Sequence, residues 1–426
     1  MNGRRPISVT FVCWQAMPAI FPASGTFVGG LETAAWLLAR SLANLDGQAD
    51  RVQIVFRSNK RDNVPVSQNV ILAANYDSRE WVRRDVSSTI SKIRTNLISR
   101  SCFRLLWQMP YLAATWPFRN RDLISGESDN RLKQWTPDVW VAFGTSLESS
   151  AVMLTARNQK AHGVLMIQSN IDLDEQYLSN PDDRNAYGEL GKNCILALRN
   201  ASLILCQTEI QVQLLRERFH LTGVRLPNAI DLQPWIDARQ STTKKRNSSM
   251  PKQVLWIGRY DRFHKRPLLC LEIARRCPEF HFRMVINTMD PKVQEEVLCN
   301  QPSNVSIVDY VPFDRMMRTM SESDLFLSTG DKRYEGFPNV LLQAAATGLP
   351  IVSLEEFDRF FLRSEAGIAC DGNIDLASSS IRDLLNGKRS IDSTRVMDYL
   401  VTHHTHVAIA QSLRKLFENL PISQNI

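Results

Sequence analysis

The sequence predicts an α/β protein with two doubly wound, Rossmann-like domains whose parallel sheets face a central cleft. Three observations predict this fold class. The chain has 426 residues, which is more than one hydrophobic core usually serves. Short apolar runs alternate with helical patterns along nearly all of it, and these runs lack the strict apolar/polar alternation of half-exposed strands, which is typical of parallel sheets covered on both faces. A polar, charged stretch divides the runs into two series.

The first series supplies the strands expected before this stretch. They are Ile7–Cys13, Arg51–Phe56, Asn69–Leu72, Asp138–Phe143, Val164–Gln168 and Ser202–Cys206. The second series is Gln253–Ile257, His281–Ile286, Asn304–Val308, Asp324–Ser328 and Pro350–Leu354. We therefore assign residues 1–237 to an N-terminal domain, 238–252 to a linker, 253–395 to a C-terminal domain and 396–426 to a helix that crosses back to the N-terminal domain.

The composition narrows the possible partners. The formal net charge of +7 favours acidic partners such as nucleotides or phospholipid headgroups, without choosing between them. No nucleic-acid recognition module is present, so no nucleic acid is expected as a partner. The eight cysteines form no C-x-x-C pair and no zinc-type cluster, and we expect them to be reduced and mostly buried, as in the cytosol.

The first residues can be interpreted in two ways. "RRPISVTFVCWQAMPAIFPASG" (residues 4–25) has the arginines and apolar stretch of a signal peptide. We prefer a buried first strand followed by a Pro/Gly loop, because the loop and helix that follow need this strand as a base. Pro18 and Pro22 argue against a spanning helix, and no other stretch has the ~20 apolar residues that a span needs. We expect a cytoplasmic protein, with peripheral contact to the inner face of the membrane as an open alternative.

Residues 79–133 interrupt the α/β pattern. They carry eleven Lys and Arg against five Asp and Glu, interleaved with aromatic residues. Such a segment can be a basic amphipathic surface for an anionic membrane. It can also be an ordinary pair of helices with a solvated basic face, and we favour this second interpretation.

The histidines near the C-terminus are a possible metal site. His403, His404 and His406 lie in a stretch expected to be helical. Two of them would share a helix face poorly, and no carboxylate lies at ligand spacing. We therefore expect surface histidines and no metal.

The first candidate site is a Gly-Gly pair before a helix. In "GTFVGGLETAAWLLARSLA" (residues 25–43), apolar residues fall at helical spacing from Leu31, so a helix begins directly after Gly29 and Gly30. Glycines let the backbone approach a ligand closely, and the free N–H groups at the helix start favour an anion. Alone, this pattern is weak evidence for a phosphate site.

The second candidate site is "VLWIGRYDRFHKRP" (residues 254–267). A strand ends at Gly258, and Arg259 follows at its carboxyl end, where ligands bind in this fold class. Lys265 lies in the loop beyond it. A guanidinium fork and an ammonium that flank one loop can hold a diphosphate, although an isolated R-x5-K is more often two solvated cations.

The third candidate site is "GDKRYEGFPNVLLQAAATGLPIV" (residues 330–352). Glu335 follows a strand, and Asn339 is the expected N-cap of a helix over Val340–Thr347 that ends at Gly348. The carboxylate and the helix N-terminus would face the same cleft. An acid beside an anion site suits a ligand with neutral hydroxyls next to a phosphate, and a nucleotide-sugar is such a ligand.

In this order, the three sites resemble glycosyltransferase family 4, the retaining GT-B enzymes. "GTFVGGLET" is similar to the family's Gly-Gly loop, "WIGRYDRFHKRP" to its G-R-x-x-x-x-x-K segment, and "EGFPNVLLQAAATGLPIV" to its E-G-F-P-N-x-L-L-E-A signature. "LILCQTEIQVQLL" and "LPNAIDL" also match the end of the family's N-terminal domain. The resemblance spans roughly residues 7–420 and is weakest over 75–135.

The resemblance implies a retaining, metal-independent hexosyltransferase without cofactor. It would move a hexose from a UDP- or GDP-linked donor to a glycan or lipid-linked acceptor, in cell-surface polysaccharide or glycolipid synthesis. Arg259 and Lys265 would neutralise the leaving diphosphate, and Glu335 would contact donor-sugar hydroxyls. The implied donor-binding residues are Gly29, Gly30, Phe337, Pro338, Asn339, Val340 and Gln343. Contacts to the acceptor or sugar are expected from Ser169, Asn170 and Asp172.

This sequence departs from the family pattern at two places. The second signature glutamate, which accepts from the ribose hydroxyls, is Gln343 here. A neutral acceptor in place of a charged one costs ~1 kcal/mol, about five- to tenfold in donor affinity. Many members place a histidine after the fifth strand, where this chain has Gln168, Ser169 or Asn170. His162 precedes that strand, at the wrong end for the cleft.

Three alternatives stay open. Asp172 and Asp174 form the D-x-D pattern of another glycosyltransferase fold, but the context of that fold is missing. A non-catalytic homologue that binds nucleotide-sugar or glycan, or supports a partner enzyme, fits Gln343 and the missing histidine. Sugar epimerisation or phosphorolysis on the same architecture fits the signature around Glu335 poorly.

Overall fold

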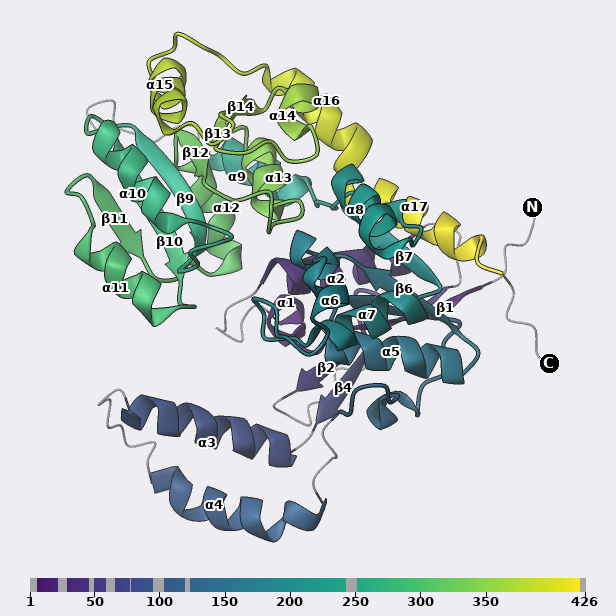
Figure 1. The fold of residues 1–426 in the computed structure, drawn as a ribbon. Helices are drawn as coiled ribbons and strands as arrows, with labels where there is room; N and C mark the ends of the chain where they lie inside the picture. Colours follow the sequence, from purple (N-terminus) through teal and green to yellow (C-terminus); the bar gives the residue numbers. More distant parts are fainter. Residues whose placement is uncertain are drawn as a thin grey trace.

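The computed structural model describes residues 6–21, 29–45, 50–58, 66–76, 78–94, 103–118, 123–242 and 251–421. These residues form two α/β domains, each a parallel sheet between layers of helices, and the strands run toward the region between the domains (Figure 1). The fold class predicted from the sequence is therefore confirmed.

The described part of the N-terminal domain contains a sheet of eight strands in the order β3-β4-β2-β1-β5-β6-β7-β8. All neighbouring strands are parallel except β3 and β4. The strands are β1 Ser8–Val12, β2 Arg51–Ser58, β3 Val66–Ser67, β4 Val70–Tyr76, β5 Val139–Phe143, β6 His162–Met166, β7 Leu203–Cys206 and β8 Val224–Arg225. The helices are α1 Met17–Ile20, α2 Gly30–Ala43, α3 Ser78–Arg94, α4 Leu105–Ala114, α5 Leu147–Asn158, α6 Gln176–Ser179, α7 Gly191–Asn200 and α8 Glu209–Phe219.

The C-terminal sheet has six strands among the described residues, all parallel, in the order β11-β10-β9-β12-β13-β14. Its strands are β9 Gln253–Arg259, β10 His281–Asn287, β11 Val305–Val308, β12 Leu325–Ser328, β13 Ile351–Ser353 and β14 Gly367–Ala369. The remaining helices are α9 Gln233–Thr242, α10 Pro267–Arg276, α11 Pro291–Cys299, α12 Phe313–Ser321, α13 Asn339–Ala346, α14 Phe360–Ser364, α15 Ile374–Leu385, α16 Ser393–His404 and α17 His406–Glu418.

Burial explains why the strands lack alternation. Every residue of β5 is buried, and its consecutive residues Trp140 and Val141 belong to the cores on opposite faces of the sheet. Val141 packs with α2 and α17, whereas Trp140 packs with α5 and α7. Consecutive residues of such a strand are therefore both apolar, as the sequence pattern predicted.

The chain crosses between the domains twice. Helix α9 extends through Thr242 into the stretch expected to be a linker, and its Trp235 packs edge-on against Phe313 of the C-terminal domain. Helix α16 packs on the C-terminal domain, and α17 returns to the N-terminal core through Leu413 and Phe417 (Figure 1). Residues 243–250 of the expected linker lie outside the described residues.

The structure also describes the expected first strand and most of the cysteines. Residues 8–12, inside the stretch that resembles a signal peptide, form the buried strand β1. Of the described cysteines, Cys299 is exposed and the others are buried, as expected. Within the described ranges, no helix is both long and apolar enough to span a bilayer.

Candidate functional site

The carboxylate of Asp261 fixes the conformation of the loop after β9. Asp261 Oδ1 accepts hydrogen bonds from the backbone N–H groups of Phe263 and His264, each at 2.8 Å. Its other oxygen, Oδ2, lies 2.9 Å from His264 Nδ1 and 3.4 Å from Arg259 Nε. Burial raises the pKa of Asp261, but the hydrogen bonds and charge of His264 and the charge of Arg259 outweigh burial, so its pKa lies well below the usual range. The carboxylate therefore stays ionised and orients Arg259.

The second expected cation, Lys265, contacts the third candidate site. Its ammonium forms an ion pair with Glu335 Oε1. Two of the predicted catalytic residues therefore meet, Lys265 from the loop after β9 and Glu335 from the loop after β12. Arg259 is the last residue of β9 and pairs with Asp261. Arg259 is the more exposed of the two cations, with 35% of its side chain accessible.

Glu335 has hydrogen-bonding capacity left over. The residue is 9% exposed, and its Oε2 atom is buried without a hydrogen-bond partner among the described residues. Its backbone N–H donates to the carbonyl of Asp331, which fixes the loop. Because a buried carboxylate oxygen normally accepts a hydrogen bond, this atom is suited to a hydroxyl donor.

Helix α13 begins one residue earlier than predicted. Pro338 is its N-cap and Asn339 its first residue, so the predicted N-cap role of Asn339 is wrong. The Asn339 side chain instead accepts from Asn228 Nδ2 at 2.7 Å and donates to the carbonyl of Gly30 at 3.4 Å. These contacts across the cleft hold the side chain away from its own helix terminus.

The backbone of Phe337 is already engaged. Its N–H donates to Gln207 Oε1 at 3.0 Å, and its carbonyl accepts from Asn228 Nδ2 at 2.9 Å. Its side chain is buried in the C-terminal core. Of the predicted donor contacts on this segment, Val340 and Gln343 lie half-buried on α13.

Gly29 is the N-cap of α2 and Gly30 its first residue, one residue earlier than predicted, and the Gly30 carbonyl accepts from Asn339 of α13. Glu32, in the first turn of this helix, was not among the residues predicted for the site. A Cβ atom on Gly29 would lie 2.2 Å from Glu32 Oε2, so this carboxylate folds back over the helix start. Burial raises the pKa of Glu32, while the N–H groups of Glu32 and Gly29 and the charge of Arg259 oppose that rise. An acidic residue in the first turn of a helix is the signal that could have predicted this.

Of the three residues expected to contact acceptor or sugar, Ser169 and Asn170 form hydrogen bonds with the C-terminal domain. Ser169 Oγ donates to the carbonyl of Tyr334 and Asn170 Nδ2 to that of Lys332, each at 2.7 Å. These bonds join the N-terminal domain to the loop that carries Glu335.

The expected ligand role of Asp172 is contradicted. The residue is 4% exposed, and its carboxylate accepts from the backbone N–H groups of Thr145, Gln168 and Ser169. Burial raises its pKa, and these backbone hydrogen bonds oppose the rise. Asp172 shapes the loop that presents Ser169 and Asn170 and is not free for a ligand.

Tyr187 is a residue between the domains that was not predicted from the sequence. Its hydroxyl lies 2.8 Å from His264 Nε2, and the two rings are 5.4 Å apart. Asp261, His264 and Tyr187 thus form a chain of contacts from one domain to the other. No local pattern marks Tyr187, because its partner lies 77 residues further along the chain.

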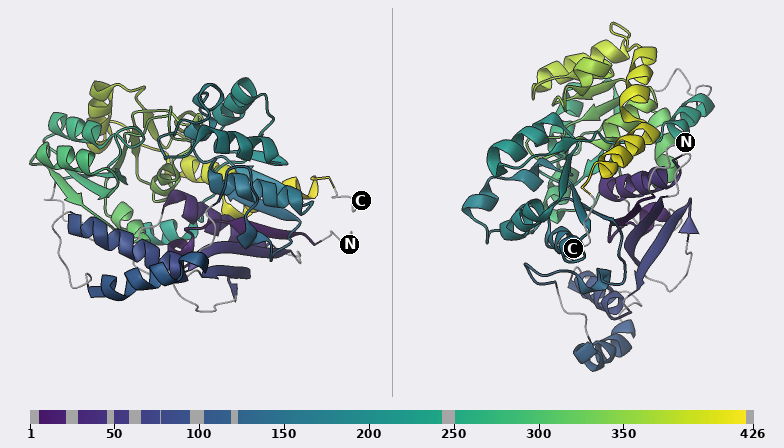
Figure 2. Two further views of the ribbon diagram at one scale, coloured as in Figure 1. Left: turned by 60° about the horizontal axis from the view of Figure 1, so that its bottom comes forward. Right: turned by 90° about the vertical axis from the view of Figure 1, so that its right-hand side faces the viewer.

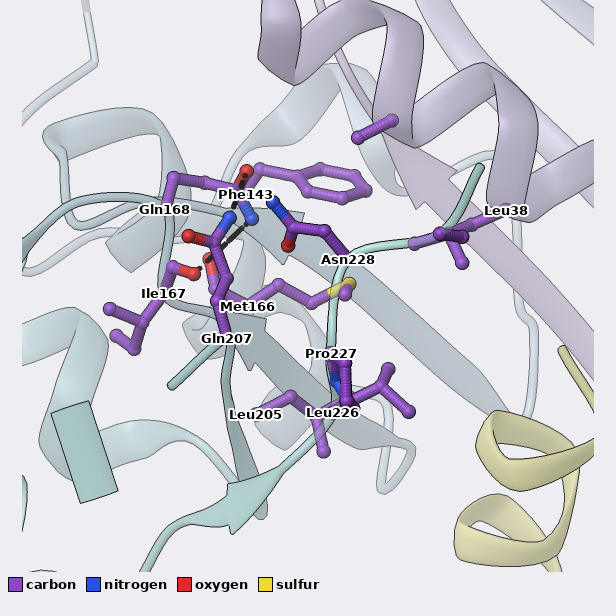
Figure 3. A pocket seen from close by; sticks show the side chains of 12 residues that line it. Leu38, Phe143, Met166, Ile167, Gln168, Leu205, Gln207, Leu226, Pro227 and Asn228 are labelled. Atoms are coloured by element: carbon purple, nitrogen blue, oxygen red, sulfur yellow. Dashed lines mark hydrogen bonds between the residues drawn. The ribbon is translucent and has the colours of Figure 1, made fainter. Parts of the chain in front are cut away.

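An apolar pocket opens at the carboxyl ends of β5, β6 and β7, beneath α2 (Figure 3). Gln168, Gln207 and Asn228 supply its polar groups. Gln207 and Asn228 also hold Phe337, so the pocket adjoins the contact between the domains. The remaining lining is mostly apolar: Ala34, Leu38, Phe143, Met166, Ile167, Leu205, Leu226, Pro227 and Ala229.

The histidines do not gather. In the described parts of the chain, no group of three or more His, Cys, Asp or Glu side chains is placed to hold a metal ion. His162 begins β6, at the end of the strand away from the cleft. The expectation that His404 is a surface residue is wrong, because it is 2% exposed and its Nδ1 lies 2.9 Å from the carbonyl of Asn228.

Comparison with known proteins gives matches of two kinds. Residues 251–386 match the family model of the Glycosyl transferases group 1. No curated protein sequence matches the chain. Sucrose-phosphate synthase from Thermosynechococcus elongatus is similar in structure, with a TM-score of 0.68 and 14% identity over 99% of this chain and 100% of that one.

Two further solved structures were determined with ligands. HepE from Anabaena, in complex with UDP and glucose, has a TM-score of 0.62 and 11% identity over 97% of this chain and 100% of its own. TarM from S. aureus, in complex with Fondaparinux, alpha-GlcNAc-glycerol and UDP, has the same TM-score and identity over 96% and 99%. The chain therefore has the GT-B fold of glycosyltransferases, and its residues 251–386 match the Glycosyl transferases group 1.

Proposed function

We propose that the protein is a retaining glycosyltransferase that transfers a hexose from a nucleoside-diphosphate sugar to a glycan or lipid-linked acceptor. The observation that carries the proposal is the ion pair between Lys265, in the loop that follows Arg259 and β9, and Glu335, in the loop that leads to α13. Two cations suit a diphosphate, and a buried carboxylate suits the hydroxyls of a sugar. The match to the Glycosyl transferases group 1 and the UDP and sugar complexes of similar structures support this assignment.

The chemistry follows from these charges. The bond from the sugar carbon to the diphosphate oxygen breaks as the acceptor oxygen attacks that carbon from the same face. The acceptor proton passes to the departing diphosphate. Arg259 and Lys265 would stabilise the negative charge that develops there, as a metal ion does in other enzymes, so the proposed reaction requires no metal. Binding of a diphosphate would draw Lys265 from Glu335 and leave that carboxylate to accept from the sugar.

Calorimetric titration of UDP, GDP and ADP tests the donor site. We expect one of them to bind the wild-type protein and Arg259→Ala to lose at least about tenfold in affinity, because a charged hydrogen-bonding partner contributes about 1.5–3 kcal/mol. Arg262→Ala is the matched control. Arg262 lies in the same loop but pairs with Glu296 of α11, so its removal should leave binding unchanged. Equal loss in both variants would contradict a specific role for Arg259.

A non-catalytic homologue that binds nucleotide-sugar is the second candidate. Gln343 in place of the signature glutamate and the pairing of Lys265 with Glu335 favour it. Turnover of the donor separates the two candidates, because even slow hydrolysis of the sugar–phosphate bond without acceptor identifies an enzyme. Nucleotide binding without any turnover would favour the non-catalytic protein.

A further inference from the structure

Helices α3 and α4 stand out from the N-terminal domain as a pair (Figures 1 and 2). We call residues 78–94 and 103–118 the helical hairpin. The two helices are joined by polar contacts on their facing sides. Gln108, which is fully buried, donates to Asp85 Oδ2 at 2.6 Å, and the hydroxyls of Ser78 and Tyr111 lie 2.9 Å apart.

The outward face of α4 is apolar. Five large side chains of residues 103–116 are each at least half exposed: Phe103, Leu106, Trp107, Met109 and Trp116. No charged residue occurs between residues 105 and 118. A helix on a water-facing surface normally shows the reverse, with polar residues outward and apolar residues inward. The hairpin buries Val82 and Val86 of α3 but leaves the large apolar side chains around α4 exposed, which is typical of a surface that meets an apolar phase.

The charge of the hairpin selects among possible partners. Helix α3 carries five basic residues against two acidic ones, and one of those acids, Asp85, is bonded to Gln108. Arg104 precedes α4, and the Arg79 guanidinium lies over the ring of Trp116. Arginine and tryptophan beside apolar side chains are suited to the boundary between lipid headgroups and acyl chains. A second copy of the chain fits less well, because a symmetric contact would bring two such basic helices together.

The position of the hairpin relates it to the cleft. It follows β4, which runs parallel to β2, β1, β5 and β6, so it begins at the same sheet edge as the loop of Ser169 and Asn170. A bilayer bound there would lie beside the N-terminal side of the cleft. If the proposed transfer reaction holds, this is the side from which an acceptor would enter.

We propose that the helical hairpin docks the protein on an anionic lipid bilayer by inserting the outward face of α4 among the headgroups. Binding to lipid requires neither donor nor turnover. Entry of an acceptor from this side rests on the proposed function, whereas the docking itself does not.

Vesicle flotation without nucleotide-sugar tests the docking. The probes are vesicles of phosphatidylcholine alone and vesicles that contain equal parts of phosphatidylcholine and phosphatidylglycerol. We expect the wild-type protein to float with the anionic vesicles only, and added salt to weaken its binding. Leu106→Gln/Trp107→Gln should lower the bound fraction by at least about tenfold, since it removes two inserting side chains.

The matched control is Leu298→Gln/Val401→Gln, which removes two apolar side chains, each about half exposed, from α11 and α16. It should float like the wild-type protein, and the melting temperatures of both variants would show that they fold. Absence of wild-type flotation with anionic vesicles overturns the proposal, and so does equal loss in the two variants. A concentration-dependent dimer that only Leu106→Gln/Trp107→Gln abolishes would assign the face to a second copy instead.

Discussion

At the scale of single residues, Gln343 gives a quantitative prediction. It lies on α13. At this position glycosyltransferase family 4, which the sequence resembles, has a glutamate that accepts from both ribose hydroxyls. Gln343→Glu restores a charged acceptor, and we expect nucleoside diphosphate to bind about five- to tenfold more tightly, corresponding to ~1 kcal/mol. Calorimetric titration of the nucleotide that binds the wild-type protein measures the change.

A 2′-deoxynucleotide provides the control for this prediction. Because it lacks one of the two hydroxyls, the gain from Gln343→Glu should shrink with it. Gln343→Ala should weaken binding of the ribonucleotide. If Gln343→Glu gives the same gain with both nucleotides, the carboxylate acts through general charge and not through the ribose.

The same scale shows how far the sequence could identify the site. Arg259, Lys265 and Glu335 stand in motifs of fixed local spacing, and the structure pairs Lys265 with Glu335 and Arg259 with Asp261. Asp172 also stood in a suggestive pattern, but backbone N–H groups from Thr145 and Gln168 occupy its carboxylate. The sequence shows which side chains can bind a ligand, but it does not show which of them the fold has already engaged.

At the scale of elements, the junction of α16 and α17 predicts a dependence on pH. His404 is buried there against the ring of Phe337, near Arg225 and Asp358. Burial lowers its pKa from 6.5 to about 4, so the neutral ring is the folded form. Because the pKa of His404 is lower in the folded than in the unfolded protein, its neutral ring stabilises the fold fully at pH values above the unfolded pKa. That contribution is lost as the pH falls from about 6.5 toward about 4.

We therefore expect the free energy of unfolding to fall more in the wild-type protein than in His404→Gln, by about 2 kcal/mol between about pH 7 and pH 5. Urea titrations at the two pH values measure it. His403→Gln removes the neighbouring exposed histidine and should retain the wild-type dependence. An identical pH dependence of His404→Gln and the wild-type protein would show that another group titrates.

The elements also show which parts of the fold a single sequence predicts. Long buried strands such as β1 and β9 appear as apolar runs, because both of their faces pack against helices. The strands β3, β8 and β14 were missed, since they have two or three residues each at the sheet edges and too little burial to impose a pattern. The helical hairpin was expected to be a pair of helices with a solvated basic face, and counting its charges did not show that the large apolar side chains around α4 are exposed.

At the scale of the whole molecule, hydrogen bonds hold the two domains together along the cleft. Ser169 and Asn170 bind the loop of Glu335, and Gln207 and Asn228 bind Phe337. These side chains come from loops after β6, β7 and β8, which are neighbours in the N-terminal sheet. If the loop of Glu335 and the start of α13 bind a donor, as proposed, closure of the domains and assembly of the site are coupled, because the same segment makes these contacts.

This coupling predicts that weakening the contacts separates the domains. Ser169→Ala/Asn170→Ala removes two hydrogen bonds across the cleft, about 2 kcal/mol together, which shifts the balance between closed and separated domains about thirtyfold. The radius of gyration from small-angle X-ray scattering should rise by about 1 Å.

Ser179→Ala/Asn180→Ala, at exposed positions of the same domain, is the control and should leave the radius of gyration unchanged. The nucleotide that binds the wild-type protein should restore the compact form. Arg259 and Lys265 in the C-terminal domain would then bind the same ligand that contacts the N-terminal domain. An unchanged radius in Ser169→Ala/Asn170→Ala would mean that α9 and α17, which connect the domains covalently, fix their arrangement without these bonds.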